Sequence, residues 1–160
     1  MDRSMELVID RLGRAAASEP HARLFPARNG DGWPNLTNSE AWARSGAVAS
    51  WLIAQGFGPG GRCLAVRAGD SPERAILLLG ALRAGALVAD RGAALTFASA
   101  DGPLVTPEGI ALAALARCSV DAAVAERRRH IDAATPARRQ GDRVECHGDL
   151  ADIVQAVTLA

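Results

Sequence analysis

The spacing of apolar residues predicts two helices in the first third of the chain. Apolar side chains recur every three or four residues over 4–18, which predicts an amphipathic helix that ends near Pro20. A second helix is predicted to begin at a capping Asn38 or Ser39 and to end at Gly56. Its apolar face is supplied by Trp42, Val48, Ala49, Leu52 and Ile53.

The middle of the chain alternates between short apolar runs and one well-marked helix. The candidate strands lie at residues 62–67, 87–89 and 94–98. Between the first two, Ser71 and Pro72 are typical of a helix start, and Gly85 is typical of a helix end. This alternation predicts an α/β fold in which a mostly parallel sheet carries flanking helices.

The last third of the chain has weaker local signals. In order, the pattern predicts a helix over 107–117 capped by Thr106, a charged helix over 120–134, a loop over 136–141, a strand over 143–146 and a final helix capped by Asp149. No repeat or low-complexity linker divides the sequence. We therefore expect residues 1–160 to form a single domain.

Composition and charge exclude several classes of function. Apolar residues make up 49% of the chain, and its 18 basic and 18 acidic residues give a formal net charge of +0. This balance gives no electrostatic reason to expect nucleic acid or an anionic membrane as a partner. No segment resembles a secretion signal, and no apolar run reaches the roughly 18 residues of a membrane span, so we expect a cytoplasmic protein.

The cysteines do not suggest a metal site. Cys63, Cys118 and Cys146 are far apart, odd in number and without metal-site spacing. In a cytoplasmic protein they are expected to be reduced and packed as small apolar groups.

The densest set of reactive side chains lies near the end of the chain, at Cys146, His147, Asp149 and Asp152. A thiol, an imidazole and a carboxylate are the groups of a nucleophile–base–orienter set. However, adjacent residues of a strand point to opposite faces, so Cys146 and His147 are not expected to meet. A structural role, with Asp149 as a helix cap, is the favoured interpretation.

A run of basic residues offers a second candidate site. Arg127, Arg128, Arg129 and His130 are consecutive, and an arginine fork fits a phosphate such as that of coenzyme A or phosphopantetheine. The alternative is a solvated helix face whose charge is balanced by nearby carboxylates, at Asp121, Glu126 and Asp132. Arg138 and Arg139 would extend the basic patch.

Three stretches resemble a known family, the adenylate-forming enzymes, which include acyl-CoA synthetases, luciferases and peptide-synthetase adenylation domains. The first runs from about residue 7 to 88 and includes the glycine turn at 56–61, the strand after it, and the segments Ser71-Pro72-Glu73 and Leu79-Gly80-Ala81-Leu82-Arg83-Ala84-Gly85. The second covers residues 95–110, and the third covers residues 141–153. The resemblance implies a truncated N-terminal subdomain of such an enzyme.

The second stretch stands where the family has its phosphate loop, and it makes Ser99 and Gly102 candidate ligand-binding residues by resemblance. The loop holds a single central glycine and an added carboxylate, Asp101, and the whole chain contains no lysine. Between residues 88 and 95 the family has a further strand–helix unit that this chain lacks. The resemblance therefore implies a shortened, degenerate relative that does not carry out adenylation and has no bound cofactor.

These observations lead to three hypotheses. The first is a non-catalytic, acyl-CoA synthetase-like protein that acts as an assembly partner in an acyl or polyketide-type thioester pathway. Because a shortened fold would expose apolar surface, we expect a homo-oligomer or a protein partner such as an acyl carrier protein. The alternatives are a protein that binds an acyl, coenzyme A or nucleotide ligand without turnover, and a small thioester-processing enzyme that uses Cys146 and His147.

Overall fold

The protein was analysed as a computed structural model that describes residues 6–24, 36–69, 71–98, 105–106, 109–116 and 122–157. Within these residues the helices are α1 (Val8–Ser18), α2 (Asn38–Ala54), α3 (Pro72–Ala84), α4 (Leu112–Leu115), α5 (Ala122–Arg128) and α6 (Ile153–Val157). The strands are β1 (Cys63–Arg67), β2 (Leu87–Ala89), β3 (Leu95–Ala98), β4 (Pro136–Gln140) and β5 (Arg143–Cys146). A short 3-10 turn covers His147–Asp149.

The strands form one five-stranded sheet in the order β3-β1-β2-β4-β5. β1 lies parallel to both β2 and β3, and β2 lies parallel to β4. β4 and β5 pair antiparallel, as neighbours in a hairpin. The predicted α/β fold with a mostly parallel sheet is therefore confirmed.

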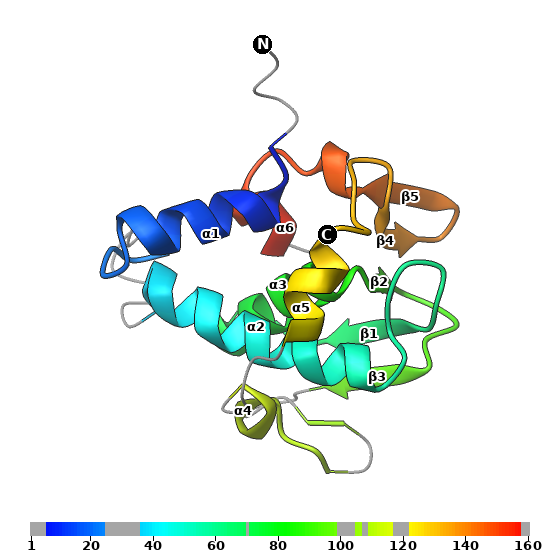
Figure 1. Cartoon of the computed structure of the whole chain (residues 1–160). Coiled ribbons are helices and arrows are strands. Elements are labelled where there is room, and N and C mark those ends of the chain that lie inside the picture. The colour runs from blue at the N-terminus through cyan, green and yellow to red at the C-terminus, as the bar shows by residue number, and fades with distance from the viewer. Residues whose placement is uncertain are drawn as a thin grey trace.

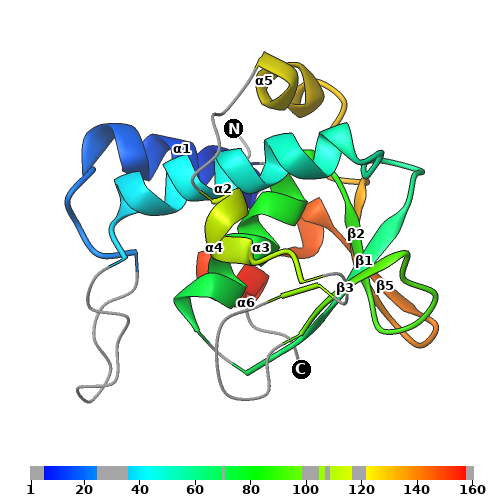
Figure 2. The ribbon, with the colours of Figure 1, turned by 90° about the horizontal axis from the view of Figure 1, so that it is seen from below.

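The helices lie on one side of this sheet (Figures 1 and 2). In β1, Leu64 is fully buried and Val66 packs against the same core. Because side chains alternate along a strand, Ala65 and Arg67 point to the opposite face. In the part of the chain that the structure describes, the helices thus cover one face of the sheet.

Helices α2 and α3 pack closely against each other at the centre of the core. A Cβ atom added to Gly80 of α3 would lie 2.7 Å from Val48 Cγ1 and 3.2 Å from the backbone oxygen of Ser45. Glycine at this position therefore sets how near the two helix axes can approach.

Helix α3 begins and ends where the sequence predicts. The Ser71 hydroxyl oxygen accepts a hydrogen bond from the backbone N–H of Arg74 at 3.1 Å, and Pro72 occupies the first turn. Gly85 ends the helix with a left-handed φ of 72°. The start of α2 differs from the prediction, because Thr37 caps it and accepts a hydrogen bond from the N–H of Glu40.

The predicted loop over 136–141 was wrong, because residues 136–140 form β4. This segment contains no β-branched or aromatic residue, so local propensity does not favour a strand. Its strand conformation comes from its two neighbours, β2 on one side and β5 on the other.

Three helices near the end of the chain are shorter than predicted. Thr106 does not cap α4, because its hydroxyl accepts the N–H of Ile110 in a tight turn that contains Gly109. Helix α5 ends at Arg128 rather than at residue 134. The final helix is capped by Asp152, which accepts the N–H of Gln155, whereas Asp149 accepts the N–H of Cys146.

Candidate functional site

A crevice of about 380 Å³ lies at the carboxyl ends of three neighbouring parallel strands. Its wall is formed by residues 65–68 at the end of β1, 88–90 at the end of β2, and 138–140 of β4, together with Arg74 of α3. In open parallel sheets the carboxyl edge of the strands is where ligands commonly bind. We therefore take this crevice as the candidate functional site.

Small, buried side chains on the face of the sheet away from the helices line part of the hollow. Ala65 and Ala89 line the crevice and belong to adjacent strands. Because side chains alternate along a strand, Arg67 shares the face of Ala65, and Arg139 is the register partner of Ala89. The methyl groups of Ala65 and Ala89 are small, so a space remains between the side chains of Arg67 and Arg139.

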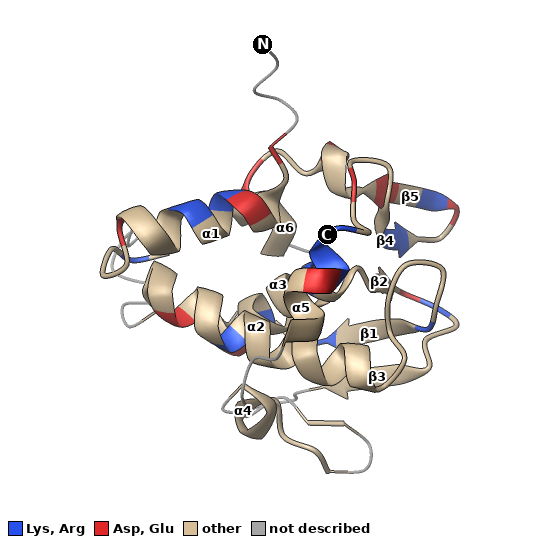
Figure 3. Cartoon of the chain, viewed as in Figure 1, with Lys and Arg blue, Asp and Glu red and all other residues tan. Residues whose placement is uncertain are grey.

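The charge that lines the crevice is strongly positive. It contains four arginines, Arg67, Arg74, Arg138 and Arg139, and a single carboxylate, Asp90. Figure 3 shows basic residues at the end of β1 and along β4. Such a surface attracts anions, and arginine forks match the geometry of carboxylate and phosphate oxygens.

Arg138 is held in place from two sides. Its Nε and Nη2 donate to the two carboxylate oxygens of Glu145 at 2.9 and 3.3 Å, and its Nη1 donates to the backbone oxygen of Gln155 at 3.1 Å. The hydrogen bond from Arg138 holds the pKa of Glu145 below its usual value. Arg138 therefore supplies a positioned side chain whose charge is largely matched by Glu145.

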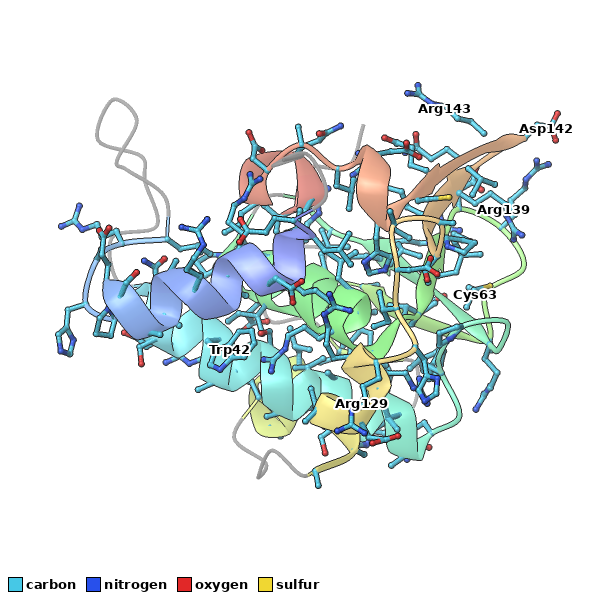
Figure 4. All side chains as sticks on the ribbon, turned by 45° about the horizontal axis from the view of Figure 1, so that its top comes forward. Trp42, Cys63, Arg129, Arg139, Asp142 and Arg143 are labelled. Carbon is cyan, nitrogen blue, oxygen red and sulfur yellow. The ribbon has the colours of Figure 1, made fainter. Side chains whose placement is uncertain are left out.

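The Arg139 guanidinium and the loop after β2 fix each other at the mouth of the crevice. Arg139 Nη2 donates to the backbone oxygen of Arg91 at 3.1 Å, and the N–H of Asp90 donates to the backbone oxygen of Arg139. The Asp90 carboxylate in turn accepts the N–H of Gly141 at 3.0 Å. Figure 4 shows Arg139 on the β4–β5 hairpin near its outer end, which carries Asp142 and Arg143.

The crevice is lined by charged groups and hydrogen-bond donors. Among the described residues that line it there is no cysteine, histidine or serine. Of the described lining residues, Asp90 alone carries a side chain able to act as a base or nucleophile, and its carboxylate accepts the backbone N–H of Gly141.

Of the four ligand-binding candidates from the sequence, Ser99 and Gly102 lie outside the described residues. Arg128 binds both carboxylate oxygens of Asp10, at 2.8 and 2.5 Å, and donates to the backbone oxygen of Ile131. Arg129 is 78% exposed and lies 3.5 Å from a carboxylate oxygen of Glu126. The structure does not bring Arg128 and Arg129 to the crevice.

The first arginine of the same run has a structural role. Arg127 Nη1 donates to the backbone oxygens of Phe57 at 2.8 Å and Ala84 at 2.7 Å. It therefore ties α5 to the loop before β1 and to the end of α3.

The Cys146 and His147 side chains do not form a catalytic pair in this structure. His147 is 2% exposed, and its Nε2 has no hydrogen-bond partner among the described residues. Burial, reinforced by the charge of Arg128, lowers the pKa of His147 to about 4. The Asp149 carboxylate is used by the backbone N–H of Cys146, at 2.8 Å, rather than by the imidazole. The described residues also contain no group of three or more His, Cys, Asp or Glu side chains able to hold a metal ion.

Sequence reasoning missed most of the crevice. The sequence pattern points to Arg138 and Arg139 only as an extension of the Arg127–Arg129 run, and it does not single out Arg67, Arg74 or Asp90. Their positions in the sequence could have indicated the site, because Arg67 ends one predicted parallel strand and Asp90 directly follows another, and ligands bind at the carboxyl ends of such strands.

Comparisons with known proteins leave the family open. A scan against protein-family models and a search of curated proteins found no match to this chain.

In the part of the chain that the structure describes, no helix combines the length and apolar character that crossing a membrane requires.

Proposed function

We propose that this protein binds a small anionic ligand in the crevice at the carboxyl ends of β1, β2 and β4, without turning it over. The observation that carries the proposal is a cavity of about 380 Å³ lined by four arginines and one carboxylate, with one of the four, Arg138, paired with a further carboxylate, that of Glu145. A cavity of this size falls at the lower end of the range for small-molecule sites, about 300 to 1,000 Å³. The described lining residues include no cysteine, serine or histidine, and the carboxylate of Asp90 is taken up by the backbone N–H of Gly141, which supports binding rather than catalysis.

The resemblance to adenylate-forming enzymes narrows the choice of ligand. A shortened and degenerate scaffold of that family would retain affinity for an acyl, coenzyme A or nucleotide ligand after losing the parts needed for adenylation. The choice of ligand class is taken from this sequence resemblance, and the site itself must show the function. AMP and coenzyme A are therefore the first probes to test.

Titration calorimetry with AMP and coenzyme A tests the proposal. The double variant Arg67→Gln/Arg139→Gln removes two charges from the crevice and keeps the Arg138–Glu145 pair. We expect it to weaken binding by about tenfold or more, because charge-assisted hydrogen bonds are lost.

The matched control is the double variant Arg44→Gln/Arg129→Gln. It removes two exposed arginines that do not line the crevice. It is expected to bind both ligands as the unaltered protein does. Absence of binding to the unaltered protein, or equal affinity of the crevice variant, would contradict the proposal.

A second candidate function is that of an assembly partner in a thioester pathway. Val105 and Ile110 are exposed apolar residues beside β3, an edge strand, and Val144 is exposed on β5 at the opposite edge. Under this candidate the chain forms a homo-oligomer or binds a protein such as an acyl carrier protein. Native mass spectrometry of the protein purified from its own host would show a second chain, and a monomer without a partner would count against it.

A further inference from the structure

A second cavity, of about 320 Å³, lies on the helical side of the molecule. It is enclosed by α1, α2, α3 and α5 and shares no lining residue with the crevice of the sheet. Its apolar wall is formed by Ile9, Trp42, Val124 and Ala125. Its charged groups are Asp10, Arg83 and Arg128.

Arg83 is a buried cation in the wall of this cavity. Its side chain comes from α3, and the residue is only 8% exposed. Nη1 donates to the backbone oxygen of Trp42 at 2.6 Å and to the Ser45 hydroxyl oxygen at 3.2 Å. The guanidinium carbon lies 3.6 Å from the centre of the Trp42 ring, a stacked cation–π arrangement.

Trp42 is itself fixed from the other helix. A Cβ atom added to Gly13 of α1 would lie 2.9 Å from Trp42 Cη2, so the glycine allows the indole to pack against α1. The cavity wall formed by Trp42 and Arg83 is therefore rigidly placed between α1 and α3.

None of the described carboxylates forms an ion pair with Arg83. The carboxylate of Asp10, which also lines the cavity, binds Arg128 through both of its oxygens. The side chains of Arg128 and Asp10 remain 38% and 42% exposed, so this pair lies at the solvent side of the cavity. Arg128 and Asp10 neutralise each other, and Arg83 leaves one unmatched positive charge inside.

A buried cation without a counter-charge is unfavourable, and burial lowers the pKa of Arg83 to about 10. The guanidinium nevertheless remains protonated near neutral pH. An anion that enters the cavity would complete the arrangement, and the hydrocarbon walls favour an anion with an apolar body.

We propose that the cavity between α1, α2, α3 and α5 binds a small monocarboxylate with an aliphatic body. The carboxylate pairs with Arg83, and the hydrocarbon chain packs against Ile9, Trp42 and Val124. The single positive charge of Arg83 fits a monoanion, because a dianionic phosphate would keep one negative charge without a partner in the cavity. This inference does not depend on the function of the crevice in the sheet.

Octanoate and 1-octanol are matched probes, since they share a chain and differ in charge. Calorimetry follows their binding, and tryptophan fluorescence, to which Trp42 contributes together with the two other tryptophans of the chain, gives a second readout. Octanoate is expected to bind and 1-octanol to bind at least about tenfold more weakly, because the ion pair with Arg83 is absent. Equal affinity for the two probes, or no binding of octanoate, would overturn the proposal.

Two variants separate the role of Arg83 from general effects on folding. Arg83→Gln is expected to abolish the preference for octanoate. Ala125→Trp fills the cavity from α5, where residue 125 is exposed, and leaves Arg83 in place. It is expected to block octanoate, whereas Ala122→Trp, on the same helix but outside the lining, is expected to bind normally.

The two proposed sites can be distinguished by the same variants. Octanoate binding is expected to survive in Arg67→Gln/Arg139→Gln, and binding of AMP or coenzyme A is expected to survive in Ala125→Trp. Octanoate binding that persists in Ala125→Trp or disappears in the crevice variant would overturn the assignment to the helical cavity.

Discussion

At the level of single residues, His147 is a buried imidazole whose pKa is strongly shifted from its value in water. Its pKa falls from 6.5 to about 4 because the imidazole is buried, with a further decrease from the charge of Arg128 that Asp132 opposes. The unfolded chain therefore takes up a proton on His147 at a higher pH than the folded protein. Above pH 6.5 the imidazole is neutral in both the folded and the unfolded chain, so the free energy of unfolding is at its full value. It decreases as the pH falls from 6.5 toward 4, where only the unfolded chain carries the proton.

This shift predicts a loss of about 3 kcal/mol in the free energy of unfolding over that range of pH. Urea unfolding at a series of pH values measures it. The variant His147→Gln should show a flatter dependence on pH. The control His130→Gln, which alters an exposed imidazole, should keep the full slope. An identical slope in the two variants would show that His147 is not the group responsible.

At the same scale, the arginines show why residue type alone does not identify a site. Arg127, Arg128 and Arg129 are adjacent in sequence, yet they contact backbone carbonyls, a carboxylate of α1 and an exposed glutamate, respectively. Each contact depends on which helix face the residue occupies and on what packs against that face. The sequence could predict the run but not the partners.

At the level of elements, the strongest predictions came from local signals. The β1–α3–β2 unit was predicted because Ser71, Pro72 and Gly85 mark the ends of α3 by their own chemistry. Strand β4 was missed because its residues, Pro136–Gln140, form a strand only through pairing with β2 and β5. Tertiary contacts, which a single sequence does not display, decide such segments.

The close packing of α2 and α3 predicts the effect of Gly80→Ala. Alanine would favour the helix by about 1 kcal/mol over glycine. Against this, its Cβ would lie 2.7 Å from Val48 Cγ1 and 3.2 Å from the Ser45 backbone oxygen. Overpacking of this kind costs about 1–3 kcal/mol, so we expect a net loss of about 1 kcal/mol in the free energy of unfolding.

Thermal and urea unfolding measure this change. The control is Gly69→Ala, because a Cβ atom at residue 69 would have no neighbour within 4 Å. The control is expected to change stability by less than about 0.5 kcal/mol. A Gly80→Ala protein as stable as the unaltered chain would mean that α2 and α3 can separate without cost.

At the level of the whole molecule, the fold class followed from the sequence but the binding crevice did not. The crevice combines the ends of β1, β2 and β4 with the first turn of α3, which are far apart in the chain. Arg67 and Arg139 share the face of the sheet away from the helices only because strand order and register place β2 between their strands. Those two properties are set by the fold as a whole.

The connection from β2 to β3 also shapes the molecule. Five residues, 90–94, separate the two strands, and Cys63 Sγ donates to the backbone oxygen of Gly92 at 3.3 Å within this loop. The same loop carries Asp90 and Arg91, which bind the backbone and side chain of Arg139. The short connection therefore helps to position the basic wall of the crevice.

The most direct test of the account is an amide chemical-shift titration of the isotope-labelled protein with AMP and with coenzyme A. The account predicts that at least one ligand shifts amides of residues 66–68, 89–90 and 138–140 and is recovered chemically unchanged. No shift with either ligand, or shifts confined to other parts of the molecule, would contradict the claim that the crevice is an anion-binding site. A ligand recovered as a reaction product would contradict the claim that it binds without turnover.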